Sequence, residues 1–294
     1  GLIMQVLNWR WLFFIIIPFS IISLILGYKY IENVTELSKP PIDIVSIILS
    51  TIGFGGIIYG VSNIGSSYVY LIAGPIIVSA IALVIFVIRQ LHMSEPMLDM
   101  RPFKESMFSI GCILMIIMHM INFATMLILP MFLEGALALS AFTAGLLMLP
   151  GGIFNGILSP ISGHLYDKFG PKALIIPGFA ISTIAFFLLS CFVSMTISIP
   201  MIIALHCLSL IAVGLINTPV QTNTLNQLSP KYYPHGTAIM NTLQQIAGAF
   251  GTSLFVAIMT SYQKKYLFTV SNSSAAKYQS LSLVYGVQHV FIIE

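Results

Sequence analysis

The chain has 294 residues, of which 57% are hydrophobic and only 7% carry a formal charge, and its mean hydropathy is +0.98. A typical soluble domain is about 25% charged, so this chain has too little polar surface to cover a water-soluble globule. The composition therefore excludes a cytosolic enzyme and a disordered tail. The net charge of +3 is not gathered into a basic run, which also excludes a nucleic-acid binder. We interpret the chain as an integral membrane protein.

Long stretches without Asp, Glu, Lys or Arg predict the membrane spans, because a spanning helix needs about 20 mostly apolar residues. In chain order the predicted spans are residues 9–27, 42–62, 68–89, 107–130, 140–163, 171–193, 199–222 and 236–260. A ninth apolar run begins near Leu281 and reaches Glu294. None of these runs alternates apolar and polar residues as barrel strands do. We therefore predict an all-α, polytopic transmembrane helix bundle, in which every span satisfies its own backbone.

The basic residues of the short loops predict the orientation, since cytoplasmic loops carry an excess of Lys and Arg. If residues 163–172 are cytoplasmic, eight basic residues lie inside and four lie outside. The inner ones are Lys29, Lys39, Arg89, Arg101, Lys104, Lys168, Lys172 and Lys231, and the outer ones are Arg10, Lys264, Lys265 and Lys277. The balance favours this orientation, although three lysines between residues 261 and 280 oppose it.

The most specific local pattern is Gly163-His-Leu-Tyr-Asp167-Lys168-Phe-Gly170-Pro-Lys172. It predicts a short charged loop between two spans, in which glycine permits a tight turn and the lysines hold the loop in the cytoplasm. Asp167 is expected to cap the next helix or to pair with a lysine. An ordinary positive-inside loop would look similar, but the full spacing G-x-x-x-D-K-x-G-x-K favours a defined motif.

This spacing resembles the cytoplasmic loop signature of the major facilitator superfamily, G-x-x-x-D-[RK]-x-G-x-[RK]. Two further stretches are similar to the fourteen-helix drug:proton antiporters of the lincomycin-resistance type, namely NWRWLFFIIIP at residues 8–18 and HGTAIMNTLQQIAGAFGT at residues 235–252. The first stretch departs from the family pattern, because Ile16 or Ile17 stands where the family usually has Asn.

The resemblance implies the major-facilitator fold and a division of the chain into three parts. Residues 1–35 would be the last helix of the N-terminal half, 36–104 two linker helices, and 105–294 a six-helix C-terminal half that is truncated in its last helix. Gly1 is not an initiator methionine and the last apolar run is short. We therefore expect a fragment that runs from helix six into helix fourteen of such a protein.

The resemblance also implies a multidrug exporter of a bacterial plasma membrane, which exchanges a drug-like molecule for protons by alternating access. Its expected partners are the lipid bilayer, a small-molecule substrate, protons and the N-terminal half of the same chain. No cofactor or metal is expected, and the sequence contains no common catalytic motif. The alternatives are an exporter of an endogenous lipid or metabolite with this fold, and a non-transporting membrane protein.

The candidate site residues fall into two groups. By the resemblance, the gating motif comprises Gly163, Asp167, Lys168, Gly170 and Lys172. Polar side chains within spans tend to face a cavity or a neighbouring helix, and the cavity candidates are His119, Asn122, Asn155, Asn217, Gln221, Asn241 and Gln244. For the amides, interhelical hydrogen bonding is the alternative to cavity lining.

Two other features of the spans carry expectations. Glu134 is a candidate proton site at a membrane border, with a solvated loop residue as the alternative, and the main proton carrier is expected upstream of Gly1. The pairs Gly56 and Gly60, and Gly152 and Gly156, predict close helix packing, because small residues four apart let two backbones approach.

Overall fold

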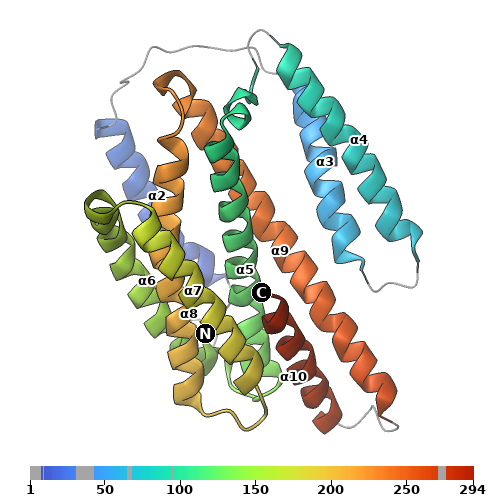
Figure 1. Ribbon diagram of the computed structural model, residues 1–294. Coiled ribbons are helices and arrows are strands. Elements are labelled where there is room, and N and C mark those ends of the chain that lie inside the picture. Colours follow the sequence, from blue (N-terminus) through green and yellow to red (C-terminus); the bar gives the residue numbers. More distant parts are fainter. Residues whose placement is uncertain (1–7, 9, 31–42, 65–67, 94–95, 271–275) are drawn as a thin grey trace.

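The computed structural model describes residues 8, 10–30, 43–64, 68–93, 96–270 and 276–294 of the chain (Figure 1). Within these residues the chain is helical and has no strand, which confirms the predicted fold class. The helices are α2 (Trp11–Tyr30), α3 (Ile44–Ser62), α4 (Tyr70–His92), α5 (Ser106–Gly135), α6 (Ala141–Phe169), α7 (Lys172–Phe192), α8 (Ile199–Leu225), α9 (Tyr233–Thr269) and α10 (Ala276–Ile293), with short 3-10 turns η1 (Arg101–Lys104) and η2 (Pro230–Tyr232). In the described part of the chain, eight helices are long and apolar enough to cross a membrane. The predicted domain boundary at residue 35 lies outside the described residues, and so do Trp9 and Lys39.

Several helices are longer than the charge-free windows that predicted them. The span expected at 140–163 belongs to α6, which continues to Phe169. Its ends are set by local chemistry, because the Ser140 side chain accepts a hydrogen bond from the Thr143 backbone N–H (3.1 Å) and Gly170 ends the helix at φ +78°. Charged residues indicate where a helix leaves the hydrocarbon core of the membrane. The helix itself ends only where a capping residue or a helix-breaking residue interrupts its backbone hydrogen bonds.

Helices α5 to α10 form one bundle with α5 near its centre. α5 packs against α6, α8, α9 and α10, and α8 also packs against α6 and α7. Toward one membrane face the core contains Phe132 of α5, Leu189 of α7 and Val287 of α10. Toward the other face it contains Phe108 of α5 and Ile239 of α9. The central position of α5 explains why one of its faces is buried along nearly its whole length.

The hairpin of α3 and α4 lies beside this bundle, with α3 against α9 (Figure 1). Its two helices approach closely at the predicted glycines. A Cβ on Gly56 would lie 3.3 Å from the Pro75 carbonyl, and one on Gly60 would lie 3.0 Å from the Ile72 carbonyl. The packing prediction is therefore confirmed for this pair. Gly152 and Gly156 on α6 have no described neighbour within 4 Å, so their predicted packing is not found in this part of the chain.

A polar network closes the end of the hairpin at Asp43. Arg89 donates two hydrogen bonds to the Asp43 carboxylate, from Nε (2.7 Å) and Nη2 (3.1 Å). The Ser46 hydroxyl donates to the same carboxylate (2.5 Å), and Gln90 Nε2 donates to Ser46 Oγ (2.7 Å). The Leu98 backbone N–H then donates to Gln90 Oε1 (3.0 Å), which holds the chain after α4 against the hairpin. The Arg89 and Ser46 bonds keep the pKa of Asp43 well below its usual range, so this ion pair persists into acidic solution.

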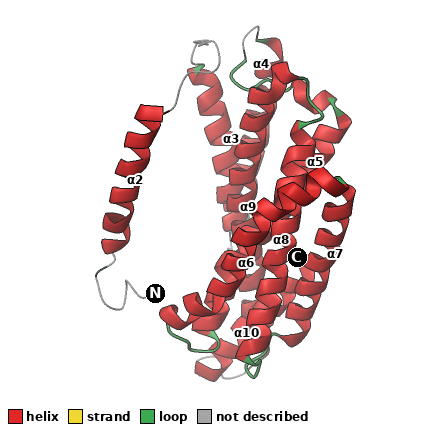
Figure 2. Cartoon of the chain, turned by 90° about the vertical axis from the view of Figure 1, so that its left-hand side faces the viewer, coloured by secondary structure: helices red, strands yellow, loops and turns green. Residues whose placement is uncertain are grey.

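Helix α2 stands apart from the other helices (Figure 2). None of its residues is buried, although its mean hydropathy reaches 2.3 over a window of span length. An apolar helix with no buried residue needs lipid or another helix to cover it. The isolated position of α2 is therefore consistent with a membrane protein in which this helix packs against something other than the bundle of α5 to α10.

The contact of α9 with α5 yields the first prediction. A Cβ on Gly251 would lie 2.5 Å from both the Cα and the carbonyl oxygen of Met120, so Gly251→Ala forces the two backbones apart. Overpacking of this kind costs about 1–3 kcal/mol. We expect Gly251→Ala to lower the thermal unfolding midpoint in detergent. Gly152→Ala is the matched control, since no atom of the described residues lies within 4 Å of a Cβ at that position. Equal midpoints for the two variants would contradict the prediction.

Candidate functional site

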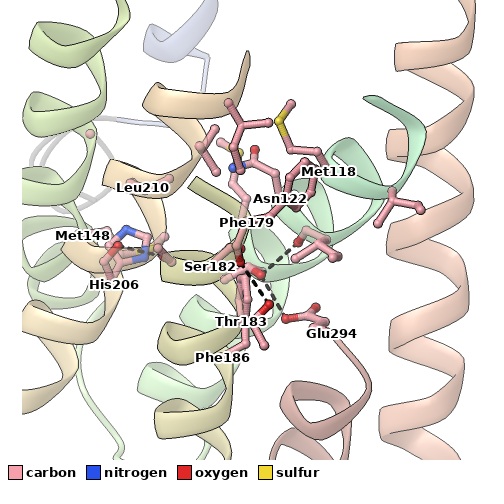
Figure 3. A pocket seen from close by; sticks show the side chains of 18 of the residues that line it. Met118, Asn122, Met148, Phe179, Ser182, Thr183, Phe186, His206, Leu210 and Glu294 are labelled. Carbon is pink, nitrogen blue, oxygen red and sulfur yellow. Dashed lines mark hydrogen bonds between the residues drawn. The ribbon is translucent and has the colours of Figure 1, made fainter. Parts of the chain in front are cut away.

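A cavity with a volume of about 480 Å³ lies within the bundle, between α5, α6, α7 and α8 (Figure 3). Its walls are mainly apolar, with polar groups at a few points. The polar lining residues are Asn122, Thr125, Ser182, Thr183, His206, Ser209 and Glu294, and the apolar ones include Met118, Met148, Phe179, Phe186 and Leu210. Such a volume, with apolar walls and few polar groups, is typical of a small-molecule site.

Two polar atoms of this cavity have no partner. Among the described residues, the buried side-chain N and O atoms without a hydrogen bond are His206 Nδ1 and Glu294 Oε1, and both residues line the cavity. Buried polar atoms are nearly always hydrogen-bonded, because leaving one unpaired costs about 1–3 kcal/mol. Their occurrence in the same cavity indicates that it receives a polar ligand, a proton or water.

His206 is held between α8 and α6. Its side chain is only 4% exposed and its ring faces the backbone carbonyl of Met148, as Figure 3 shows. Gly151 makes room for the ring, because a Cβ there would lie 2.8 Å from His206 Cδ2. The sequence shows His206 as one of six scattered histidines. Its position in the middle of a predicted span could have identified it as a functional residue, because an ionisable side chain inside a membrane is energetically costly.

Glu294 reaches the cavity from the inward face of α10. Val287, Val290 and Phe291 of the same face are at most 1% exposed, and Glu294 continues this stripe at the spacing i, i+3, i+4, i+7. Its Oε2 lies 3.1 Å from the Thr125 hydroxyl of α5. The helical spacing was visible in the sequence, but the partner on α5 was not.

Only one predicted cavity residue, Asn122, lines this cavity. His119 is buried on the same helix, but its Nδ1 lies 2.9 Å from the Met115 carbonyl of its own helix. Asn155 donates from Nδ2 to the Leu210 carbonyl (3.0 Å) and so links α6 to α8. For Asn155 the structure therefore shows interhelical hydrogen bonding.

The four remaining candidates lie on α8 and α9. They are Asn217, Gln221, Asn241 and Gln244, and they are partly or fully exposed. Their side chains make no hydrogen bond to a described residue, and the structure does not gather them around the cavity with Asn122. Their role in a substrate path stays a prediction.

The gating motif lies at the junction of α6 and α7, with most of its residues in helix. Gly163, Asp167 and Lys168 belong to the last turns of α6, Gly170 forms the turn, and Lys172 begins α7. The predicted loop is thus shorter than expected, because no residue between 163 and 169 breaks the helix. Gly170 has φ +78° and ψ 173°, a conformation that is essentially restricted to glycine.

The charges of this motif face away from the bundle. Asp167, Lys168 and Lys172 are exposed, and Asp167 makes no hydrogen bond or ion pair with any described residue. The expected capping or lysine pairing by Asp167 is therefore not seen in the described chain. Lys168 Nζ lies 5.2 Å from the ring centroid of Phe169, and Asn226 Nδ2 donates to Tyr166 Oη (3.4 Å), which links the ends of α6 and α8. The acidic group is left available to another partner.

The helical bundle with this motif at its α6–α7 turn agrees with the comparison against protein families, where residues 1–252 match the model of the Major Facilitator Superfamily. The chain belongs to the Major Facilitator Superfamily. It is therefore a member of a transporter superfamily. Together with the bacterial origin of its relatives, its spans make it a multi-pass protein of a bacterial plasma membrane.

Three curated relatives show the degree of similarity. The chain is 48% identical to the lincomycin resistance protein LmrB of Bacillus subtilis and 46% identical to LmrB of Listeria monocytogenes, in each case over 99% of this chain and 62% of the relative. It is 26% identical to the multidrug export protein EmrB of Haemophilus influenzae over 86% of this chain and 51% of the relative. The chain thus spans less than two thirds of the length of these relatives.

The turn of the gating motif yields the second prediction. An alanine at position 170 would have to adopt the glycine-restricted conformation, which costs about 1–3 kcal/mol. We expect Gly170→Ala to lower the unfolding midpoint in detergent. Gly163→Ala is the control, because a Cβ there would make only an ordinary contact with Thr218 Cγ2, 3.7 Å away. The prediction is wrong if Gly163→Ala is as destabilising as Gly170→Ala.

Proposed function

We propose that the chain is the C-terminal part of a bacterial multidrug exporter of the fourteen-helix drug:proton antiporter type. The observation that carries this proposal is the 46–48% identity to two lincomycin resistance proteins over 99% of the chain. The match to a multidrug export protein supports the broader class. Amphiphilic drugs or toxic organic compounds are the proposed substrates, and entering protons drive their export.

The proposed organisation assigns α2 to the N-terminal half, the hairpin of α3 and α4 to a linker, and α5 to α10 to the C-terminal half. The absence of any buried residue in α2 supports the first assignment, because such a helix needs neighbours elsewhere. The linker assignment is supported by the position of α3 and α4 outside the bundle, in contact with α9. The N-terminal half of the same chain would be the missing partner.

The proposed substrate class follows from the cavity. Methionine and phenylalanine side chains line it and can adapt to ligands of variable shape. Asn122, Ser182 and Thr183 supply neutral hydrogen-bonding groups, and the described residues that line the cavity include no lysine or arginine. Such a lining suits amphiphilic molecules that are neutral or weakly cationic.

Gating is proposed for Asp167 with Lys168 and Lys172. Their exposure, and the lack of a partner for Asp167 among the described residues, support a contact with the other half of the transporter. A charged contact of this kind can form in one state of an alternating-access cycle and break in the next. The gate would thus be completed only when both halves are present.

The third prediction tests proton antiport in the full-length exporter. In vesicles loaded with a lipophilic cationic dye, we expect efflux to stop when an uncoupler collapses the proton gradient. Vesicles without the exporter measure passive leakage. Efflux that persists after uncoupling would refute antiport, and an exporter that moves no dye at all would favour an endogenous lipid or metabolite as the substrate.

The fourth prediction tests the gate. Asp167→Asn keeps the shape of the side chain but removes its charge, and the loss of a charged hydrogen bond worth about 1.5–3 kcal/mol corresponds to about tenfold or more in rate. We expect dye efflux by the full-length protein to fall by about that factor. Glu105→Gln is the control, because Glu105 is an exposed carboxylate with no side-chain hydrogen bond in its cap position. An unchanged efflux rate for Asp167→Asn would remove the gating role.

A further inference from the structure

We propose that Glu294 and Thr125 form a proton-binding site inside the C-terminal half, in which Glu294 carries a proton that is exchanged during transport. The inference rests on the proposed antiport function and adds a residue to it. Glu134, the carboxylate that the sequence offered for this role, is exposed at the end of α5 and lines no part of the cavity.

The depth of the pair is that of a membrane interior. Thr125 lies ten residues before the end of α5 at Gly135, which is about 15 Å along a helix and half of a hydrocarbon core of about 30 Å. Figure 1 shows the end of α10 near the middle of the bundle's height. A carboxylate at this depth is costly unless it is paired or protonated.

Among the residues that the structure describes, no lysine or arginine lines the cavity beside Glu294. The helices packed against α10 are α5, α7 and α9. In the cavity, α5 and α7 contribute Asn122, Ser182 and Thr183 beside Thr125, and none of these side chains carries a charge at physiological pH. The described residues of α9 do not line the cavity. The other titratable side chain that lines the cavity is His206 on α8. On α10 itself, His289 stacks on Tyr262 of α9 at a centroid distance of 4.0 Å.

The hydrogen-bond geometry at Thr125 fits the protonated acid. Thr125 Oγ1 lies 2.9 Å from the Ile121 carbonyl and 3.1 Å from Glu294 Oε2. A hydroxyl has one hydrogen, and a backbone carbonyl can only accept. With an ionised Glu294 the two acceptors would have to share the single hydroxyl hydrogen, whereas a protonated Glu294 lets Thr125 donate to Ile121 and accept a separate hydrogen bond from the acid.

The same hydroxyl can also serve the ionised form. When Glu294 releases its proton, Thr125 can rotate its hydrogen from the Ile121 carbonyl to the carboxylate. The Ile121 carbonyl belongs to a regular helix and keeps its backbone hydrogen bond. One side chain therefore solvates both states of the carboxyl, which is what reversible proton transfer requires. Glu294 lines the cavity, and its Oε1 is buried with no hydrogen-bond partner among the described residues.

The fifth prediction compares Glu294→Gln with Glu134→Gln in the full-length exporter. We expect Glu294→Gln to reduce proton-driven dye efflux by about tenfold or more, since glutamine cannot bind and release a proton and each 1.36 kcal/mol added to the barrier is tenfold in rate. Dye binding, measured by fluorescence in detergent, should be retained. Glu134→Gln should behave as wild type, because its carboxylate is exposed. Full proton-driven efflux in Glu294→Gln overturns the proposal.

Two further readouts keep the test independent of folding and of the proposed function. In infrared difference spectra between acidic and alkaline pH, the wild type should show a buried carboxylic-acid C=O band that Glu294→Gln lacks; a band that persists in the variant overturns the assignment. Thr125→Val should lower efflux several-fold and Thr125→Ser should restore it, and equal rates for the two variants count against the role of the hydroxyl. If an uncoupler leaves wild-type efflux intact, the proposed antiport function is wrong. If efflux is proton-driven but does not depend on Glu294, only the proposed role of Glu294 is wrong.

Discussion

The close contact of α5 with α8 and α9 is the interaction on which the rest of the bundle depends. Gly251 of α9 lies against the backbone of Met120, Gly248 of α9 lies against the ring of Phe123, and Gly111 of α5 receives the side chain of Thr224 from α8. Lipid is as apolar as these helices, so helix association in a membrane relies on close packing and on hydrogen bonds. By fixing α5 at the centre, these contacts set the positions of all the α5 side chains that reach the cavity.

The bilayer imposes a second condition, because every polar group that enters it must find its partner inside the protein. Asn155 meets this condition with the Leu210 carbonyl, and His119 meets it with a carbonyl of its own helix. His206 and Glu294 meet it only in part. The difference separates polar residues that hold helices together from those that face a cavity, and it cannot be read from residue type alone.

The sequence predicted the helices well and their ends poorly. Windows without charged residues identify the segments that cross the hydrocarbon core, and each predicted span therefore corresponds to a helix. The windows do not show where a helix ends, since α6 continues to Phe169 and is interrupted only by Gly170 and Pro171. The spacing of Gly163, Asp167 and Lys172 identified the motif without showing that most of it is helical. His206 and Glu294 were missed because their significance depends on Met148 and Thr125, which are distant in sequence and close only after the helices pack.

The carboxyl groups of Asp43 and Glu294 show how the same physics favours opposite charge states, if Glu294 binds a proton as proposed above. Asp43 lies at a helix start and meets a guanidinium and a hydroxyl, so the ionised form has all the donors it needs and serves to hold the hairpin together. Glu294 meets one hydroxyl, whose hydrogen already has an acceptor in the Ile121 carbonyl. A protonated carboxyl can donate to that hydroxyl and so completes the hydrogen bond that the ionised form would have to share with Ile121. A fully paired group stabilises one structure, whereas an incompletely paired one can respond to what enters the cavity.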